Sequence, residues 1–153
     1  MRDADAVLED WYVGEMGGEA LFWGLAERAE PDQARKWLAL AEIESLLARR
    51  LAVALLARDR PIPECLDAPA KARVRCDAVA GTTWPEQMRW LKEIAAAALN
   101  QMRVDAARLP VSLGATGELV LAHEIALIDF AQAEIDGRAQ DSLQPVRELL
   151  SRC

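Results

Sequence analysis

The chain has 153 residues, which fits a single domain of ordinary size that can bury a core without disulfide bonds. Its net charge of −7 argues against a nucleic-acid-binding face, which needs basic residues, and against binding to an anionic membrane surface. The acidic N-terminus predicts no secretory signal, and we find no apolar run near the ~18 residues that a transmembrane helix needs. We therefore expect a cytoplasmic protein.

The N-terminal part of the chain predicts a helical hairpin. Ala, Leu, Arg and Glu dominate the composition, and these residues favour helix. A first helix is expected over residues 6–29, and Pro31 marks its end. A second helix begins at Pro31 and reaches about Arg58, before Pro61 and Pro63. Because the connection is so short, the two helices should be antiparallel neighbours.

A long connector, residues 59–83, precedes the second half of the chain. It is expected to contain a short helix that begins at a capping Asp67 and continues through Val79. The sequence Thr83-Trp-Pro-Glu86 is a capping box with proline in the first turn. It predicts a third helix over residues 83–109, followed by a turn that contains Gly114 and Gly117.

The fourth helix is expected over residues 117–136, with Gly137 after its end. A short helix should follow over residues 142–151, with Asp141 as its cap. The connector is long enough to run the length of a bundle, which would make the third helix parallel to the second. The prediction is therefore an all-α, antiparallel four-helix bundle in one domain, residues 1–153, built from two helical hairpins joined by a long crossover.

Two glutamates interrupt the apolar stripe of the first predicted helix. The stripe follows steps of four and three residues, which keep side chains on one face of a helix: Leu8, Tyr12, Glu15, Glu19, Phe22 and Ala26. Glu9 and Glu27 point the other way, as surface glutamates should. Glu15 and Glu19 are therefore the unusual residues of this helix.

The second predicted helix has one glutamate in its stripe, which consists of Trp37, Ala41, Glu44, Ala48, Leu51 and Leu55. Glu42 falls on the opposite face. Folding the hairpin about Pro31 brings Glu44 within about one turn of Glu15 and Glu19. The sequence thus predicts three converging carboxylates.

The other two long helices contribute less polarity. In the fourth, His123, the only histidine of the chain, and Glu134 face inward, although ~16 Å of helix separates them. Glu124 lies at the edge of this stripe. In the third, Glu93 is on the solvent side and the centre of the stripe is alanine, so only Gln87, Gln101 and Asp105 bring polar groups near the core.

Buried carboxylates cost several kcal/mol unless they are protonated, paired or bound to a metal. No Lys or Arg falls near the centre of the first two stripes. Four explanations stay open: metal coordination, water in a polar pocket, raised pKa values of the carboxyl groups, or a seam that dimerisation opens. A divalent or trivalent cation is the usual way to relieve repulsion among clustered carboxylates.

These residues resemble those of the ferritin-like superfamily of di-iron carboxylate proteins. The resemblance rests on Glu15-Met-Gly-Gly-Glu19-Ala-Leu-Phe in the first helix and Leu-Ala-Glu-Ile-Glu44-Ser-Leu-Leu in the second, and it covers the crossover arrangement. In that family a glutamate on each of two helices and Glu-x-x-His on each of the other two hold two metal ions. Here Leu47 stands at the histidine position after Glu44, and Gly137 at the one after Glu134.

The resemblance implies a metal site drawn from Glu15, Glu19, Glu44, His123 and Glu134. Iron or manganese would suit such carboxylates and would react with oxygen, peroxide or Fe(II). The alternatives are a metal-free bundle with a vestigial site that binds a small ligand or a protein partner, and carboxylate acid–base chemistry in a pocket. No substrate is indicated.

The remaining expectations concern cysteines, glycines and assembly. Cys65, Cys76 and Cys153 are expected to be reduced thiols, and their spacing does not support a zinc site. Gly14, Gly17, Gly18 and Gly24 lie within the first helix, where glycine is unfavourable, so another element should approach closely there. Trp90, near the edge of its stripe, would suit the interface of a homodimer.

Overall fold

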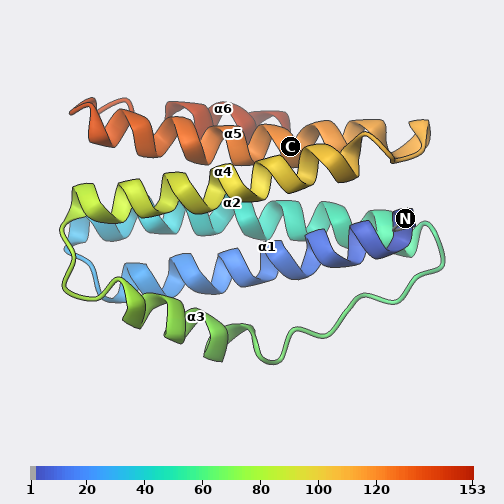
Figure 1. Ribbon diagram of the computed structural model, residues 1–153, viewed down its shortest axis with the longest axis horizontal. Helices are drawn as coiled ribbons and strands as arrows, with labels where there is room; N and C mark the ends of the chain where they lie inside the picture. The colour runs from blue at the N-terminus through green and yellow to red at the C-terminus, as the bar shows by residue number, and fades with distance from the viewer. Residues whose placement is uncertain (1–2) are drawn as a thin grey trace. The chain divides into compact units, whose positions relative to one another are not determined.

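The computed structural model describes residues 3–153, and these are all-α: 78% of them are helical and they contain no strand (Figure 1). The helices in chain order are α1 (Ala4–Glu27), α2 (Pro31–Leu56), α3 (Ala68–Ala78), α4 (Trp84–Ala106), the short 3₁₀ helix η1 (Val111–Leu113), α5 (Gly114–Ile135) and α6 (Gln144–Arg152). The predicted long helices are thus confirmed, and their ends differ from the expected ones by at most three residues.

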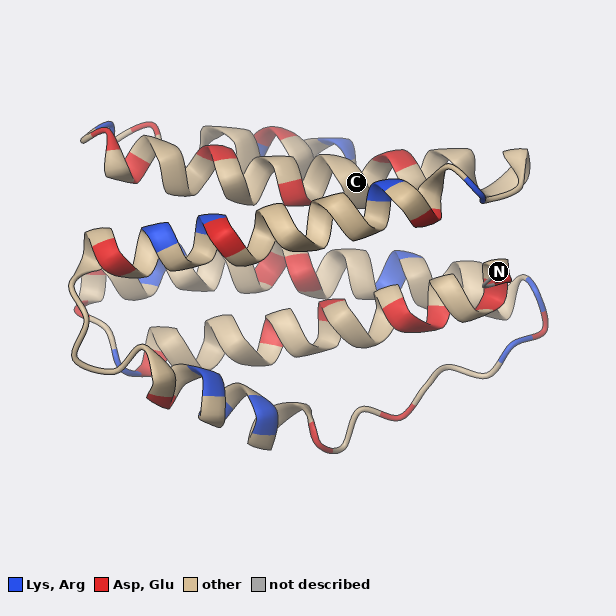
Figure 2. Cartoon of the chain, in the orientation of Figure 1, with Lys and Arg blue, Asp and Glu red and all other residues tan. Residues whose placement is uncertain are grey.

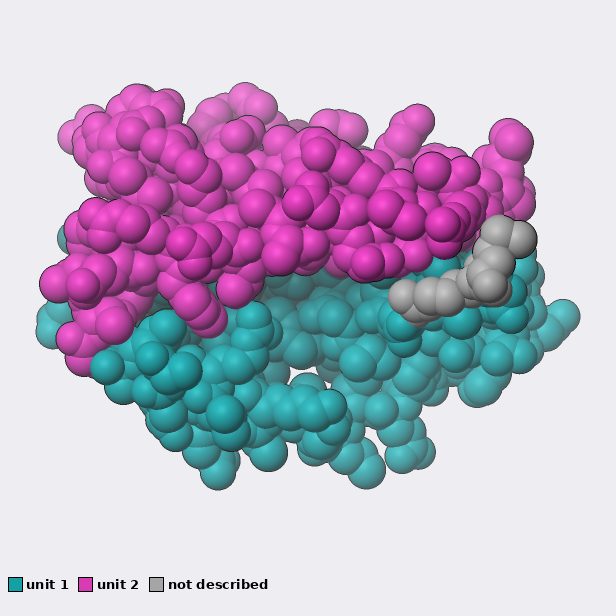
Figure 3. Space-filling model, viewed as in Figure 1, with its two compact units in different colours: residues 1–80 teal, residues 81–153 magenta. Residues whose placement is uncertain are grey.

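The chain forms two compact units, which Figure 3 colours separately. Unit 1 is Met1–Ala80 and holds α1, α2 and α3, and unit 2 is Gly81–Cys153 and holds α4, η1, α5 and α6. Each unit therefore contains one of the two predicted hairpins. The ferritin-like four-helix bundle, and the single domain that it implies, stay predictions.

The hairpin of unit 1 is tied together at both ends. The Asp3 carboxylate accepts a hydrogen bond from Ala6 N at 2.8 Å and caps α1, while Pro31 occupies the first turn of α2. Near the turn, the rings of Phe22 and Trp37 stack with centroids 5.6 Å apart. At the other end, residues just after α2 form ion pairs with the start of α1: Arg58 with Asp5, and Arg60 with Glu9 at 2.9 Å.

The connector returns along α1 and ends in α3, which lies against α1 (Figure 1). Arg28, just after α1, pairs with Asp77 of α3 at 2.7 Å. The expected short helix is confirmed and Asp67 is its N-cap residue, but the Asp67 side chain makes no capping hydrogen bond. The Asp67 carboxylate pairs with Lys71 instead, at 2.7 Å.

The hairpin of unit 2 begins at the predicted capping box. Thr83 Oγ1 accepts from Glu86 N, and the Glu86 carboxylate accepts from Thr83 N at 2.7 Å. The prediction that Gly114 and Gly117 form a turn is wrong, because α5 begins at Gly114 and Gly117 is buried within it. Asp141 does not cap α6 through its side chain; Leu143 precedes that helix.

One stretch of the described chain, Val111–Ile135, is long and apolar enough by those two measures alone to cross a membrane. The sequence was not expected to contain such a stretch, because Glu118, Glu124 and Asp129 interrupt every apolar run within it. The core helix of a soluble protein passes the same test.

Candidate metal centre

The apolar stripe of α2 is buried along its whole length, as predicted. Glu44 lies in the middle of it with 4% of its surface exposed. Glu42, two residues earlier, is exposed. The helical period therefore separates the two glutamates as the sequence predicts, and Glu44 is the carboxylate that α2 brings into the core.

The stripe of α1 is buried less evenly. Glu15 is 2% exposed, whereas Glu19 and Tyr12 are only half-buried. A further aromatic residue of this helix, Trp11, is buried, and its Nε1 has no hydrogen-bond acceptor among residues 3–153. Buried indole N–H groups usually find an acceptor, so Trp11 Nε1 is an unsatisfied donor on this part of α1.

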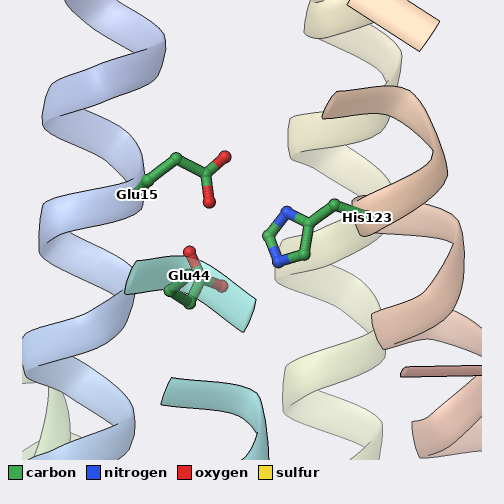
Figure 4. Close-up of side chains that lie close together, drawn as sticks. All are labelled: Glu15, Glu44 and His123. Carbon is green, nitrogen blue, oxygen red and sulfur yellow. The ribbon is translucent and has the colours of Figure 1, made fainter. Parts of the chain in front are cut away.

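Glu15 and Glu44 meet within unit 1. One carboxylate oxygen of each lies within 4.8 Å of the other, and Figure 4 draws the two side chains on α1 and α2. Two oxygen donors at this separation can bind one hard cation. Two charged carboxylates so close also repel each other, so an added cation would relieve the repulsion. The predicted pairing of Glu15 with Glu44 is confirmed.

Glu19 does not belong to the group of side chains that offers ligand atoms in this arrangement. It lies four residues after Glu15, so it shares the face of α1 but is one turn nearer the end of the helix. Its half-exposed position also lowers the cost of keeping it charged. The structure thus gives a pair of buried carboxylates in unit 1 rather than the three that the sequence predicts.

Glycine 18 makes room for Glu44. A Cβ atom placed at Gly18 would lie 2.5 Å from Glu44 Cδ and 2.9 Å from its Oε1, closer than real Cβ contacts. The Glu44 carboxylate therefore rests directly against the backbone of α1. At Gly24, a Cβ would lie 2.9 Å from Cys76 Sγ of α3. The expected close approach is thus confirmed at Gly18 and Gly24, but not at Gly14 or Gly17.

His123 is fully buried in unit 2, as the stripe of α5 predicts. Its Nδ1 lies 3.7 Å from Oε1 of the neighbouring Glu124, which is also buried although the sequence placed it at the edge of the stripe. The sequence could have indicated that Glu124 is buried, because it lies one residue after His123 on a helix with a wide apolar face. An imidazole nitrogen is a good ligand for iron, manganese and zinc once it is neutral.

Glu134 takes part in a different arrangement. Its two carboxylate oxygens accept hydrogen bonds from Trp84 Nε1 at 2.8 Å and from Ser142 Oγ at 2.5 Å. These contacts join the start of α4, the end of α5 and the segment before α6. Charge-assisted hydrogen bonds of this kind give Glu134 a structural task within unit 2, and its part in a metal site stays a prediction.

The charged side chains of α3 do not extend the site. Figure 2 shows its Lys and Arg positions in blue along the helix.

Two grooves lie between α3 and α1, one of about 300 Å³ and one of about 190 Å³, and both are lined by residues of unit 1 alone. The first is bordered by Trp23, which is 52% exposed.

Comparison with known proteins gives no relative: no protein-family model, no curated protein and no solved structure matches the chain.

Proposed function

We propose that this chain is a ferritin-like metalloprotein that binds iron or manganese through Glu15 and Glu44, with His123 as a nitrogen ligand. The observation that carries the proposal is the buried pair of carboxylates on α1 and α2, whose oxygens lie within 4.8 Å. A cation bound between them would offset the cost of keeping two carboxylates in a core.

The donor types fit the proposed metals. Carboxylate oxygens suit hard divalent and trivalent cations, and one imidazole shifts the preference from magnesium and calcium toward iron and manganese. The only histidine of the chain is buried, on the stripe of α5. When bound, such a metal supplies redox chemistry with oxygen, peroxide or Fe(II).

The chain's own residues supply the rest of the proposed site. Gly18 admits the Glu44 carboxylate against α1, and the apolar stripes around Glu15 and Glu44 limit access of water. The Asp5–Arg58 and Glu9–Arg60 pairs join the open end of the hairpin, and the buried apolar stripes of α1 and α2 hold the register that brings the two glutamates together.

Metal analysis of protein produced with added iron and manganese tests the proposal. We expect about one bound metal ion per chain or more in the wild type and in Glu42→Gln, whose exposed carboxylate lies on the same helix. Glu15→Gln and Glu44→Gln should bind little metal. Sub-stoichiometric metal in the wild type under all conditions would refute the proposal.

The contribution of His123 has its own test. His123→Gln should weaken Mn²⁺ binding about 10- to 100-fold, because a lost nitrogen ligand or its support has effects of that size. Unchanged binding in a folded His123→Gln protein would leave only the two glutamates as ligands.

The second candidate function is a metal-free helical protein that binds a small ligand or a partner. It is favoured by Leu47, which is fully buried at the position where the family places a histidine. In that case metal content would be low in every variant, and Glu44→Gln would leave binding of the small ligand or partner unchanged. Whichever function applies, we also propose a homodimer that uses Trp90 and a cytoplasmic location; sedimentation velocity tests the first.

A further inference from the structure

One glycine in the interior of α1 differs from its neighbours in what surrounds it. At Gly18 a Cβ atom would meet Glu44 Cδ at 2.5 Å and Oε1 at 2.9 Å. At Gly14 and Gly17 a Cβ atom would meet nothing within 4 Å. All three residues lie within the same helix, so α1 itself offers sites where alanine fits and one where it does not.

Gly18 lies three residues after Glu15, which places both on neighbouring turns of one face of α1. Glu44 reaches this face from α2, and its carboxylate fills the space that a side chain at position 18 would occupy. The same carboxylate has an oxygen within 4.8 Å of one on Glu15. The missing side chain at position 18 therefore sets where the Glu44 carboxylate can lie relative to Glu15.

We propose that Gly18 is a positioning residue that seats the Glu44 carboxylate beside Glu15 and so sets the geometry of the metal site. This inference rests on the proposed function for its metal, but the seat itself is a property of the metal-free protein. An alanine at position 18 pushes the end of the Glu44 side chain away from α1. Because that end is flexible, the helices keep their places and the carboxylate alone moves.

A double-mutant cycle in metal-free protein tests the seat. Alanine is favoured over glycine in a helix interior, so Gly17→Ala should raise the urea midpoint. Gly18→Ala should raise it less, or lower it, because the new methyl group displaces Glu44. In the Glu44→Ala background the two glycine substitutions should raise the midpoint equally. Equal effects in the wild-type background would overturn the proposal.

If Glu44→Ala does not fold, Glu44→Asp serves the same purpose. The aspartate side chain is one methylene shorter, so its carboxylate withdraws from position 18. The difference between the urea midpoints of Gly17→Ala and Gly18→Ala should then be smaller than it is with Glu44. If this difference in urea midpoint is the same with Glu44 as in the Glu44→Asp variant, the added methyl group does not displace the Glu44 carboxylate, and the proposal is overturned.

Titration with Mn²⁺ alone tests the consequence for the metal. We expect Gly18→Ala to weaken Mn²⁺ binding about 10- to 100-fold, while Gly17→Ala and Gly14→Ala bind as the wild type does. Wild-type affinity in Gly18→Ala would overturn the positioning role while the proposed function stands. Failure of the wild type to bind Mn²⁺ or iron would refute the proposed function, and the cycle in metal-free protein would still decide whether Gly18 seats Glu44.

Discussion

Glu15 and Glu44 are the residues at which the structure departs most from an ordinary helical core. Each is at least 96% buried, and an oxygen of one lies within 4.8 Å of an oxygen of the other. Removal of one charge from such a pair removes repulsion in the folded state, because a neutral amide keeps nearly the same shape.

The first prediction follows from this repulsion. In metal-free protein at neutral pH, Glu44→Gln should raise the free energy of unfolding by on the order of 1 kcal/mol. Glu42→Gln, on the exposed face of α2, should change it by less than about 0.5 kcal/mol. Urea denaturation in the presence of a chelator measures both values. A loss of stability in Glu44→Gln would mean that the Glu44 charge stabilises the metal-free fold.

The second prediction concerns the buried thiol of α3. Burial raises the pKa of Cys76, and its Sγ donates to the carbonyl oxygen of Leu21 at 3.7 Å. Because the thiolate is the reactive form, Cys76 should react with a disulfide reagent at neutral pH at least about tenfold more slowly than a free thiol. Mass spectrometry of briefly labelled protein measures this, with the half-buried Cys153 as the internal comparison. Equal labelling of Cys76 and Cys153 would contradict it.

The sequence identifies Glu15 and Glu44 because helical periodicity alone separates them from Glu9 and Glu42. It does not separate Glu19 from Glu15, since a step of four residues stays on the same face of the helix and only the structure shows that Glu19 is half-exposed. It also reveals glycines but not what they contact. Gly18 and Gly17 are adjacent in the sequence, and only the position of the Glu44 side chain distinguishes them.

At the scale of the helices, the prolines and Gly137 predicted the boundaries well, whereas Gly114 and Gly117 did not, since α5 begins at Gly114. Acidic residues before a helix did not predict its side-chain cap reliably. Thr83 caps α4 because Glu86 completes a reciprocal pair of hydrogen bonds. Asp67 has Lys71 four residues later and forms an ion pair instead. Asp141 lies too far before α6, which begins at Gln144. The carboxylate of an acidic residue can accept from backbone N–H groups or pair with a cationic side chain, so its position in the sequence does not predict which partner it binds.

The third prediction tests the capping box. Thr83→Ala removes the side-chain acceptor for Glu86 N and should lower the free energy of unfolding by about 1 kcal/mol. Thr82→Ala, which changes the exposed residue just before the capping position, should have a much smaller effect. Chemical denaturation at neutral pH distinguishes them, and equal effects of the two substitutions would contradict the prediction.

The fourth prediction gives the capping box a pH dependence. The hydrogen bond from Thr83 N, together with the Thr83 hydroxyl contact, holds the pKa of Glu86 below its ordinary value of 4.5. A lowered folded-state pKa contributes stability above the unfolded-state pKa, and this contribution is lost as the pH falls through the folded-state pKa. The wild type should therefore lose more stability than Glu86→Ala between about pH 6 and pH 3. Urea midpoints across this range measure the difference, and Glu93→Ala, an exposed glutamate of α4, should follow the wild type.

At the scale of the whole molecule, the order of helices and the long connector were predictable, because hydrophobic periodicity and prolines mark them directly. The connector was expected to run the length of a bundle, and in unit 1 it returns along α1 before α3 lies against that helix. The contact between α3 and α1 was not predicted, since it depends on tertiary partners such as Cys76 at Gly24 and Asp77 at Arg28. Sequence periodicity shows which face of a helix is apolar but does not name what covers it.

The fifth prediction concerns the stability of the whole chain with and without metal. A ligand that binds only the folded state stabilises it by about 2.7 kcal/mol when its concentration is 100 times its Kd. For a chain of this length, each kcal/mol raises Tm by roughly 2–4 °C, so saturating Mn²⁺ should raise Tm by about 5–10 °C. A chelator should reverse the shift, and Mg²⁺ at the same concentration should produce a smaller one, since it keeps its water ligands and demands octahedral geometry. The shift should vanish in Glu44→Gln and persist in Glu42→Gln, because only Glu44 lies beside Glu15. An equal shift in both variants would assign the metal to exposed carboxylates, and the buried pair would then have no part in binding it.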